Sequence, residues 1–413
     1  MVDKNIMGDV SMASYLDLEK LRKEHTGEVC IFGAGLIGRY DGYELITAVG
    51  FQVDFYCDNH IAPGTIIRDE IEVKDLQYLY NNKEDILVFV CVSWKYQTEV
   101  LEQLESRGVK KVEIVDFPYI FQVMESIEAA DDTIKQKYHD VYDSVEHIKR
   151  IFKRRTGYDL NIENPTTFNE KLQWLKLHDR NPLNTKMVDK YEAKLYVEEV
   201  LGKGYTIPTL GIYNSVEEIE WDKLPEQFVL KCTHDCGSVV FCSNKKNFNK
   251  NAAIQKLKSC LKRNYYWHTR EWPYKGVKPR IIAEEYMEDL SGEIIDYKLL
   301  CYNGSCKYIF TCTERFTESG LKVTFFDCEW NKLPIKRHYP VSEHKIEKPK
   351  NLKKMIEIAE KLTKEIPFVR VDFYEINGRL YIGEFTFYPG GGIEEFDDYE
   401  DDVLLGRDII CGE

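Results

Sequence analysis

The sequence lacks the usual marks of a zinc protein, a secreted protein and a membrane protein. Its 12 cysteines form no CxxC pair and no cluster with histidine, and the first ten residues do not resemble a signal peptide. We therefore expect reduced, mostly buried thiols in a cytoplasmic protein. The longest apolar runs, such as Ile86–Val92, are far shorter than the roughly 20 residues that span a bilayer, so no integral membrane segment is expected.

The chain also lacks an excess of positive charge. Its formal net charge of −14 argues against a broad nucleic-acid-binding surface. A hydrophobic content of 43% and a charged content of 31% are typical of a soluble globular protein. A single hydrophobic core rarely serves a chain as long as 413 residues, so we predict three parts. These are an N-terminal domain (1–120), a helical connector (121–180) and a C-terminal domain (181–413).

The N-terminal block alternates strand-like and helical segments, which predicts a parallel sheet covered by helices. The strand-like run VCIF leads into three glycines, Gly33, Gly35 and Gly38, and a second strand ends at Asp58. This spacing is typical of dinucleotide-binding folds, where the glycines admit a pyrophosphate and the acid binds a ribose hydroxyl. A nucleotide sugar, a nicotinamide cofactor and no ligand at all are the three alternatives that the motif leaves open.

The stretch Val369–Gly392 predicts a β-hairpin that carries two acidic residues near its centre. Apolar and polar residues alternate on both sides of an Asn377-Gly378 turn. Asp372 and Glu384 stand where apolar residues would be the default, and buried carboxylates need a cation. Two such carboxylates suit Mg²⁺ with substrate phosphates, whereas a solvated hairpin face is the alternative.

The register of this hairpin tests the magnesium hypothesis. A two-residue Asn-Gly loop would place Asp372 opposite Gly383 and turn Glu384 to the other face. A three-residue loop with a bulge at Gly378 would instead put four polar side chains on one face. These are Arg370, Asp372, Glu384 and Thr386. We therefore predict the bulged turn, with Gly378 at positive φ.

Two lysines interrupt other strand-like runs. Lys231 ends the run Phe228–Cys232, and the following turn, Thr233–Ser238, offers backbone amides and hydroxyls that suit phosphate oxygens. His234 and Asp235 in that turn are expected to be solvated. Lys298 alternates with its neighbours so that it shares a face with Asp296. The two lysines either converge on a triphosphate or are unrelated surface residues.

Several motifs in fixed order resemble the ATP-grasp superfamily, and more narrowly its TupA-like branch. They are FVLK followed by a glycine-containing turn, then IAEEYM, DYKLLCYNG, VRVDFY and GEFTFYPGGG. The resemblance covers about residues 164–408. The N-terminal FGAGLIGR is similar to small sugar-nucleotide-binding domains. The implied fold is α/β, with an N-terminal Rossmann-like parallel sheet and a C-terminal ATP-grasp fold whose two α+β subdomains clasp ATP.

The resemblance also implies roles for individual residues. ATP would lie between two sheets, one bearing Lys231, Gly237 and Ser238 and the other bearing Lys298. Glu284 and Glu285 would flank the adenine, with Asp296 near the ribose. Asp372 and Glu384 would hold Mg²⁺, Arg370 would stabilise the transferring phosphoryl group, and Gly390–Gly392 would close the site near the acceptor. Thr386 stands where the superfamily often has a metal-binding asparagine.

The implied reaction is ADP-forming ligation of a carboxylate to an amine through an acyl phosphate. The branch suggests a uronic acid, on a nucleotide sugar such as UDP-glucuronic acid, joined to an amine or amino acid in capsular polysaccharide biosynthesis. Two alternatives are a non-catalytic nucleotide-binding partner of a polysaccharide assembly complex and an NAD(P)-dependent sugar-nucleotide oxidoreductase. Whether the chain forms a homo-oligomer is open.

Overall fold

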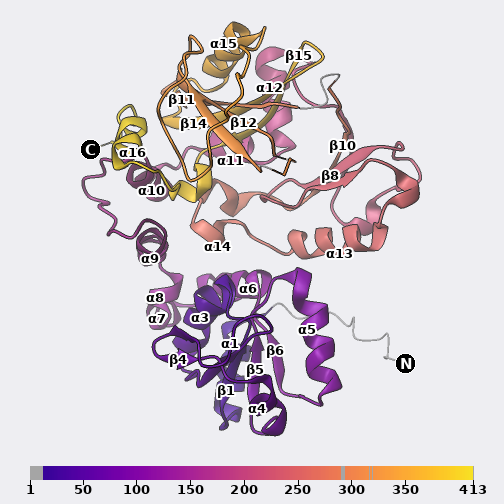
Figure 1. Ribbon diagram of the computed structural model, residues 1–413, viewed down its shortest axis with the longest axis vertical. Coiled ribbons are helices and arrows are strands. Elements are labelled where there is room, and N and C mark those ends of the chain that lie inside the picture. The colour runs from indigo at the N-terminus through magenta and orange to yellow at the C-terminus, as the bar shows by residue number, and fades with distance from the viewer. Residues whose placement is uncertain (1–12, 290–293, 316, 319, 413) are drawn as a thin grey trace. The chain divides into compact units, whose positions relative to one another are not determined.

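The computed structural model describes residues 13–289, 294–315, 317–318 and 320–412 (Figure 1). Contacts between residues divide the chain into two compact units, Met1–His147 and Ile148–Glu413. This division falls inside the segment 121–180, whose elements are helices, so the three-part division stays a prediction. No helix in the described residues is long and apolar enough to cross a membrane.

The first unit is built on a parallel sheet with the order β2-β1-β5-β6. The strands are short and nearly all apolar, as expected where helices cover a sheet. Its strands are β1 (Val29–Phe32), β2 (Phe55–Cys57), β5 (Leu87–Val90) and β6 (Val112–Ile114), with a small hairpin of β3 (Ile66–Arg68) and β4 (Ile71–Glu72). Its helices are α1 (Tyr15–Glu24), α2 (Leu36–Arg39), α3 (Asp41–Val49), α4 (Leu76–Asn81), α5 (Trp94–Ser106), α6 (Phe117–Glu128), α7 (Asp132–Lys137) and α8 (His139–Tyr142).

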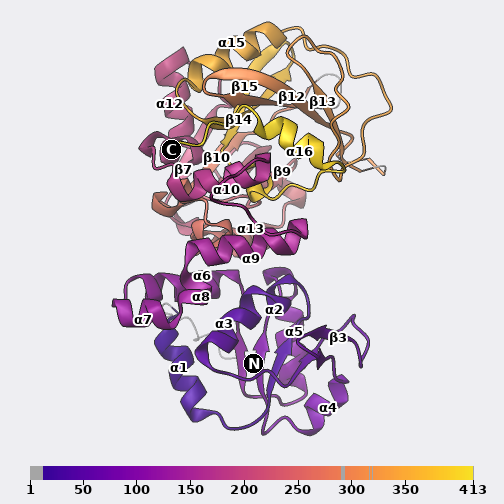
Figure 2. The ribbon, with the colours of Figure 1, turned by 90° about the vertical axis from the view of Figure 1, so that its left-hand side faces the viewer.

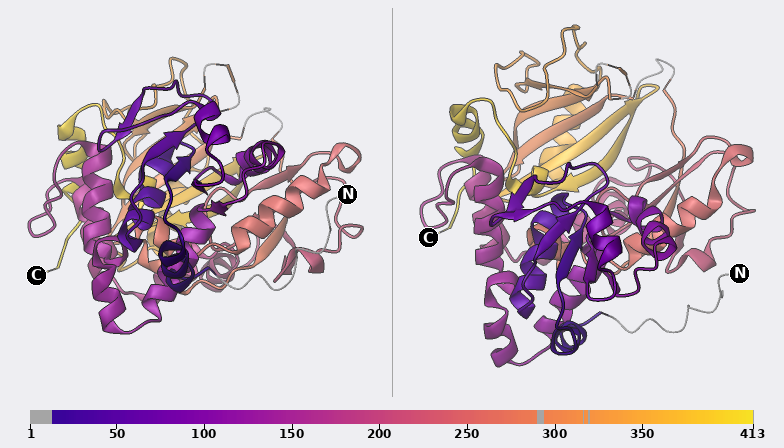
Figure 3. Two further views of the ribbon diagram at one scale, coloured as in Figure 1. Left: turned by 90° about the horizontal axis from the view of Figure 1, so that it is seen from below. Right: turned by 60° about the horizontal axis from the view of Figure 1, so that its bottom comes forward.

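The second unit contains two antiparallel sheets, coloured salmon and orange to yellow in Figure 3. The four-stranded sheet has the order β7-β10-β8-β9, formed by β7 (Thr209–Tyr213), β8 (Phe228–Cys232), β9 (Val240–Cys242) and β10 (Ile281–Glu285). The five-stranded sheet has the order β13-β12-β11-β14-β15. Its strands are β11 (Asp296–Tyr302), β12 (Ser305–Thr313), β13 (Lys322–Phe326), β14 (Phe368–Ile376) and β15 (Arg379–Thr386).

Helices and short 3₁₀ segments surround the two sheets. The α-helices are α9 (Ser144–Thr156), which crosses the boundary between the units, α10 (Phe168–His178), α11 (Pro182–Val188), α12 (Glu192–Leu201), α13 (Lys250–Leu261), α14 (Tyr266–Thr269), α15 (Leu352–Leu362) and α16 (Tyr399–Gly406). The 3₁₀ segments are η1 (Val216–Glu218), η2 (Lys245–Asn247), η3 (Trp272–Gly276) and η4 (Pro389–Gly392). Helix α10 begins at a capping box formed by Thr167 and Glu170.

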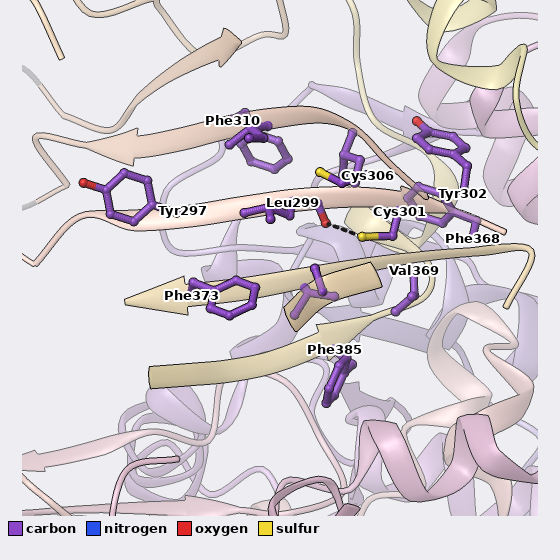
Figure 4. Packing of buried hydrophobic residues seen from close by; sticks show 14 of the residues in the cluster. Tyr297, Leu299, Cys301, Tyr302, Cys306, Phe310, Phe368, Val369, Phe373 and Phe385 are labelled. Carbon is purple, nitrogen blue, oxygen red and sulfur yellow. Dashed lines mark hydrogen bonds between the residues drawn. The ribbon is translucent and has the colours of Figure 1, made fainter. Parts of the chain in front are cut away.

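One face of the five-stranded sheet packs into the main core of this unit (Figure 4). Leu299 and Cys301 of β11, Phe373 of β14 and Phe385 of β15 are all at most 3% exposed on that face. Helix α15 contacts β11, β12 and α12 (Figure 2). Since strand side chains alternate between faces, the opposite face carries the polar residues that the sequence singled out.

The outer side of β15 is also occupied. Thr206, in the segment that leads from α12 into β7, forms a parallel bridge with Ile382. The Ile382 amide donates a hydrogen bond to the Tyr205 carbonyl at 2.7 Å. The segment that enters the four-stranded sheet is therefore fixed to the far strand of the five-stranded one.

Candidate active site

The β14–β15 hairpin brings the two predicted metal ligands together, but not through the predicted turn. The strands pair up to Ile376 and Arg379, so the loop contains only Asn377 and Gly378. Both have positive φ, +50° and +77°, as a two-residue hairpin turn requires. The positive φ of Gly378 is confirmed, whereas the predicted three-residue loop with a bulge at this glycine is wrong.

The extra residue lies at Gly383 instead. The register shifts between Asp372 and Phe373, which pair with Glu384 and Ile382 and leave Gly383 between them. A Cβ atom on Gly383 would lie 2.7 Å from the ring of Tyr374, so only glycine leaves room for that ring. This bulge restores the face that a two-residue turn would have reversed, and Asp372 lies directly opposite Glu384.

Asp372 is the centre of a buried ionic cluster on this face. It is 1% exposed, and Arg370 Nε and Nη2 donate to its two oxygens at 2.6 and 2.7 Å. Lys298 on the neighbouring strand bridges Asp372 and Asp296, with 2.7 Å between Lys298 Nζ and Asp296 Oδ2. Glu384 completes the cluster at the surface, where its side chain is 46% exposed and accepts a hydrogen bond from Arg370 at 3.0 Å.

The charges in this cluster set the ionisation of its acids. Burial alone would raise the pKa of Asp372, but Arg370 and Lys298 outweigh it and hold that pKa below its usual value. Burial raises the pKa of Asp296, which Lys298 only partly offsets. The cluster therefore keeps Asp372 ionised, as a ligand for a hard cation must be.

A second ionic cluster surrounds Glu284 on the four-stranded sheet. Glu284 is 4% exposed and forms ion pairs with Lys194 of α12 and, at 2.6 Å, with Lys231 of β8. Burial raises the pKa of Glu284, but the two lysines outweigh it and lower that pKa. Lys194 also donates to the Ile207 carbonyl at 2.6 Å. Glu285 follows on β10, pairs with Phe228 and is exposed, so it does not join this cluster.

The turn after β8 is folded around two hydrogen bonds. Ser238 Oγ accepts from the Cys232 amide at 2.8 Å and donates to Asp235 Oδ1 at 2.5 Å. Gly237 is exposed at φ +87°, with nothing within 4 Å of a Cβ position. The expectation that His234 and Asp235 are solvated is wrong, because they are 2% and 1% exposed. Asp235 is inside because it accepts the hydrogen bond from Ser238, whereas Cys236 and Gly237 at the tip of the turn are exposed.

Two residues of the site escaped sequence reasoning. Lys190 donates to the Asp235 carbonyl from the segment that precedes α12, and Lys194 reaches Glu284 from that helix. Both belong to the run DKYEAK, which reads as an ordinary charged helix start. Lys190 and Lys194 are four residues apart near a helix start, which places them on one side of it. This spacing was the only feature of the sequence that could have indicated their shared place in the site.

The donor set fits Mg²⁺ together with nucleotide phosphates. Among the described residues no three His, Cys, Asp or Glu side chains form a metal cage, so phosphate oxygens would have to complete the coordination. Asp296 Oδ1 is buried and accepts no hydrogen bond from the part of the chain that the structure describes, which suits a ribose hydroxyl. Thr386 Oγ1 lies 3.4 Å from Glu384 Oε1, so this hydroxyl stands beside the predicted metal ligand.

In the first unit, Asp58 is committed to the backbone around the glycine loop. Its Oδ2 accepts from the Ala34 amide at 2.9 Å, and its Oδ1 accepts from the His60 and Ile61 amides. Gly33 has φ +104°, and a Cβ on Gly38 would lie 1.9 Å from the Gly33 carbonyl oxygen. A Cβ on Gly35 would meet nothing within 4 Å. These residues build the tight strand-to-helix turn, and their binding roles stay predictions.

Comparisons with known proteins point to one family. Residues 170–410 match the family model described as TupA-like ATP-grasp. No curated protein matches the chain. Among solved structures, a D-alanine–D-alanine ligase from Bacillus anthracis with ATP is similar over 93% of this chain and 96% of that one, with 12% identity and a TM-score of 0.32. A D-cycloserine synthetase matches over 92% and 99%, with 14% identity and a TM-score of 0.29. These scores are too low to bear on the activity of this chain.

Proposed function

The chain belongs to the TupA-like ATP-grasp family, and from that premise we propose that it joins a uronic acid to an amine in surface polysaccharide assembly. This membership confirms the family resemblance that the sequence predicted. The chain is therefore an ATP-dependent carboxylate–amine ligase that uses ATP with Mg²⁺ and releases ADP. The uronic acid, the amine and the roles of individual residues belong to the proposal.

The observation that carries the proposal is the polar face of the five-stranded sheet. Two carboxylates for a cation, Asp372 and Glu384, lie directly opposite each other there. Lys298 and Arg370 contact the same buried carboxylate. Phosphoryl transfer needs positioning and neutralised charge more than covalent help from the protein, and this face offers both.

We assign the steps as follows. An oxygen of the uronate carboxylate attacks the γ-phosphorus of ATP, the bond to the β-phosphate oxygen breaks and ADP leaves. The amine nitrogen then attacks the acyl carbon, phosphate leaves and the nitrogen loses a proton. Arg370 stabilises the charge of the moving phosphoryl group, while Lys231 and Lys298 hold phosphate oxygens. Asp372 and Glu384 would hold Mg²⁺, which would supply further neutralisation of the phosphates.

The substrate class rests on two features. The first is the resemblance to the TupA-like branch, which implies a uronic acid as the carboxylate substrate. The second is the glycine loop of the first unit, in which Gly33 has positive φ, and a glycine loop before a helix can admit a pyrophosphate. We propose that this unit binds a nucleotide sugar such as UDP-glucuronic acid.

Release of phosphate and ADP tests the proposal. The protein is incubated with ATP, Mg²⁺, a uronate and a panel of amines and amino acids, and the amide product is identified by mass spectrometry. Phosphate is expected only with a matched uronate and amine. A phosphorylated uronate that accumulates without need of an amine would instead indicate a kinase. Arg370→Ala is expected to lower turnover by a factor on the order of 10³.

A further inference from the structure

An aromatic segment lies beside the candidate site and has no role in it so far. It connects α13 to β10 and contains six ring-bearing residues within ten positions: Tyr265, Tyr266, Trp267, His268, Trp272 and Tyr274. Tyrosine and tryptophan combine an apolar ring with a polar group, so such a run of rings beside a site suits ligand binding as well as packing. The segment therefore calls for a functional explanation.

The segment packs against the turn that follows the metal-binding hairpin. A Cβ on Gly391 would lie 3.0 Å from Thr269 Cγ2, so this glycine and Thr269 are in close contact. Thr269 Oγ1 donates to Glu271 at 2.6 Å. Segment η3 packs on α11, which in turn contacts β15. The aromatic segment thus borders the end of the site where the family resemblance places the acceptor.

Three of the six rings in this segment are already buried or covered by a cation. Tyr266 and Trp267 are 8% and 3% exposed, and Lys275 lies 4.9 Å from the centre of the Tyr266 ring. The Arg180 guanidinium lies 5.3 Å from the ring centre of Trp272. Tyr265, His268, Trp272 and Tyr274 each keep part of their surface exposed, and among these Tyr265 and Tyr274 are the two tyrosines.

Tyr265 and Tyr274 contact each other in the segment that borders the candidate site. Their ring centres are 4.8 Å apart at an interplanar angle of 63°, so together they make a corner. Burial raises the pKa of both phenols, and Glu271, Cys236 and Glu384 raise it further. The pair thus lies within electrostatic reach of both the turn after β8 and a proposed metal ligand. Both hydroxyls stay protonated and can donate hydrogen bonds.

We propose that Tyr265 and Tyr274 bind the sugar ring of the uronic acid, which packs its C–H face into the corner between the two rings. This rests on the proposed function. A pyranose ring has an apolar face that packs on aromatic rings and hydroxyls that need polar partners, and tyrosine offers both. The carboxylate at one end of such a sugar would then lie toward Glu384, where the phosphoryl group is transferred.

Isothermal titration with D-glucuronate tests this inference. The full chain is loaded with Mg²⁺ and a non-hydrolysable ATP analogue, so no amine and no turnover are needed. Tyr265→Ala and Tyr274→Ala are each expected to weaken glucuronate binding about tenfold, because the loss of one aromatic contact lowers an affinity by about that factor. The affinity for the ATP analogue is expected to stay within about twofold of the wild type, since neither ring is assigned to the nucleotide. Phe241→Ala, which removes a ring that is 62% exposed on β9 of the four-stranded sheet, is the matched control and is expected to change neither affinity.

The outcomes separate this inference from the proposed function. Wild-type protein that binds the ATP analogue but neither glucuronate nor galacturonate would overturn the proposed substrate class, and this inference with it. Wild-type binding that both alanine variants retain would overturn this inference alone, as would an equal loss of affinity for the ATP analogue. Should the alanine variants fail to fold, Tyr265→Phe and Tyr274→Phe decide, because loss of a hydroxyl contact is expected to weaken glucuronate binding about threefold.

Discussion

Asp372 lies directly opposite Glu384 across the β14–β15 ladder, although the turn that connects their strands has only two residues. The bulge at Gly383 produces this relationship. The turn and the bulge are each favoured locally, the first by Asn-Gly and the second by a ring packed on a glycine. The face of the sheet that carries the proposed chemistry therefore depends on both of them.

Gly383→Ala should damage the metal site more than Gly378→Ala. A methyl group at position 383 would meet the Tyr374 ring, and such overpacking costs about 1–3 kcal/mol. Position 378 has open space but positive φ, so alanine there costs about 1 kcal/mol and leaves the bulge in place. Urea unfolding and titration of ADP with Mn²⁺ measure the two effects. Equal Mn²⁺ affinity in both variants would show that the bulge does not control the site.

Asp372→Asn and Glu384→Gln should separate stability from metal binding. Asp372 neutralises two buried cations, so its loss is expected to lower the free energy of unfolding by about 3–5 kcal/mol. Glu384 is half-exposed, and its substitution is expected to change that free energy by less than about 1 kcal/mol. Both variants should lose Mn²⁺ binding in the presence of ADP. Retained metal affinity in Glu384→Gln would remove Glu384 from the proposed ligands.

Lys231→Met should weaken ATP binding more than Lys194→Met. Glu284 would keep Lys194 as a partner in the first variant, so the fold should tolerate the change. Lys194 instead holds Glu284, the Ile207 carbonyl and the Thr209 hydroxyl, so its loss should mainly lower the melting temperature. Nucleotide titration and thermal unfolding check the two expectations, and the reverse ranking of ATP affinities would contradict the assigned roles.

Stability should fall as the pH rises from about 4 to about 6 because of Asp402. Burial raises the pKa of this carboxyl to about 6, although Asn169 partly offsets the effect through its amide and side chain. Between the two pKa values the folded state keeps a proton that the unfolded state has lost. The free energy of unfolding is therefore lower above the folded pKa than below the unfolded pKa, by about 3 kcal/mol. Chemical unfolding across this range measures it. Asp402→Ala should remove this slope, and Asp401→Ala should keep it.

Alternation and turn residues were enough to predict the hairpin of β14 and β15, the strand Phe228–Cys232 and which polar residues share a face, whereas β7 and β13 were not predicted. Lys298 and Asp296, for example, lie on one face, as their spacing indicated, and the structure adds an ion pair between them. The bulge at Gly383 could not be predicted, because it depends on where the Tyr374 ring packs rather than on the turn. Nor could the burial of His234 and Asp235 or the reach of Lys194 to Glu284, since these arise from contacts between elements distant in sequence.

The bridge between Thr206 and Ile382 has a consequence for how the chain behaves at high concentration. An edge strand exposes unpaired amides and carbonyls that can pair with a strand of another molecule. β15 is an edge strand of the five-stranded sheet. Here the chain covers part of that edge with its own backbone. A mutation that loosened residues 205–206 would therefore be expected to promote self-association through β15.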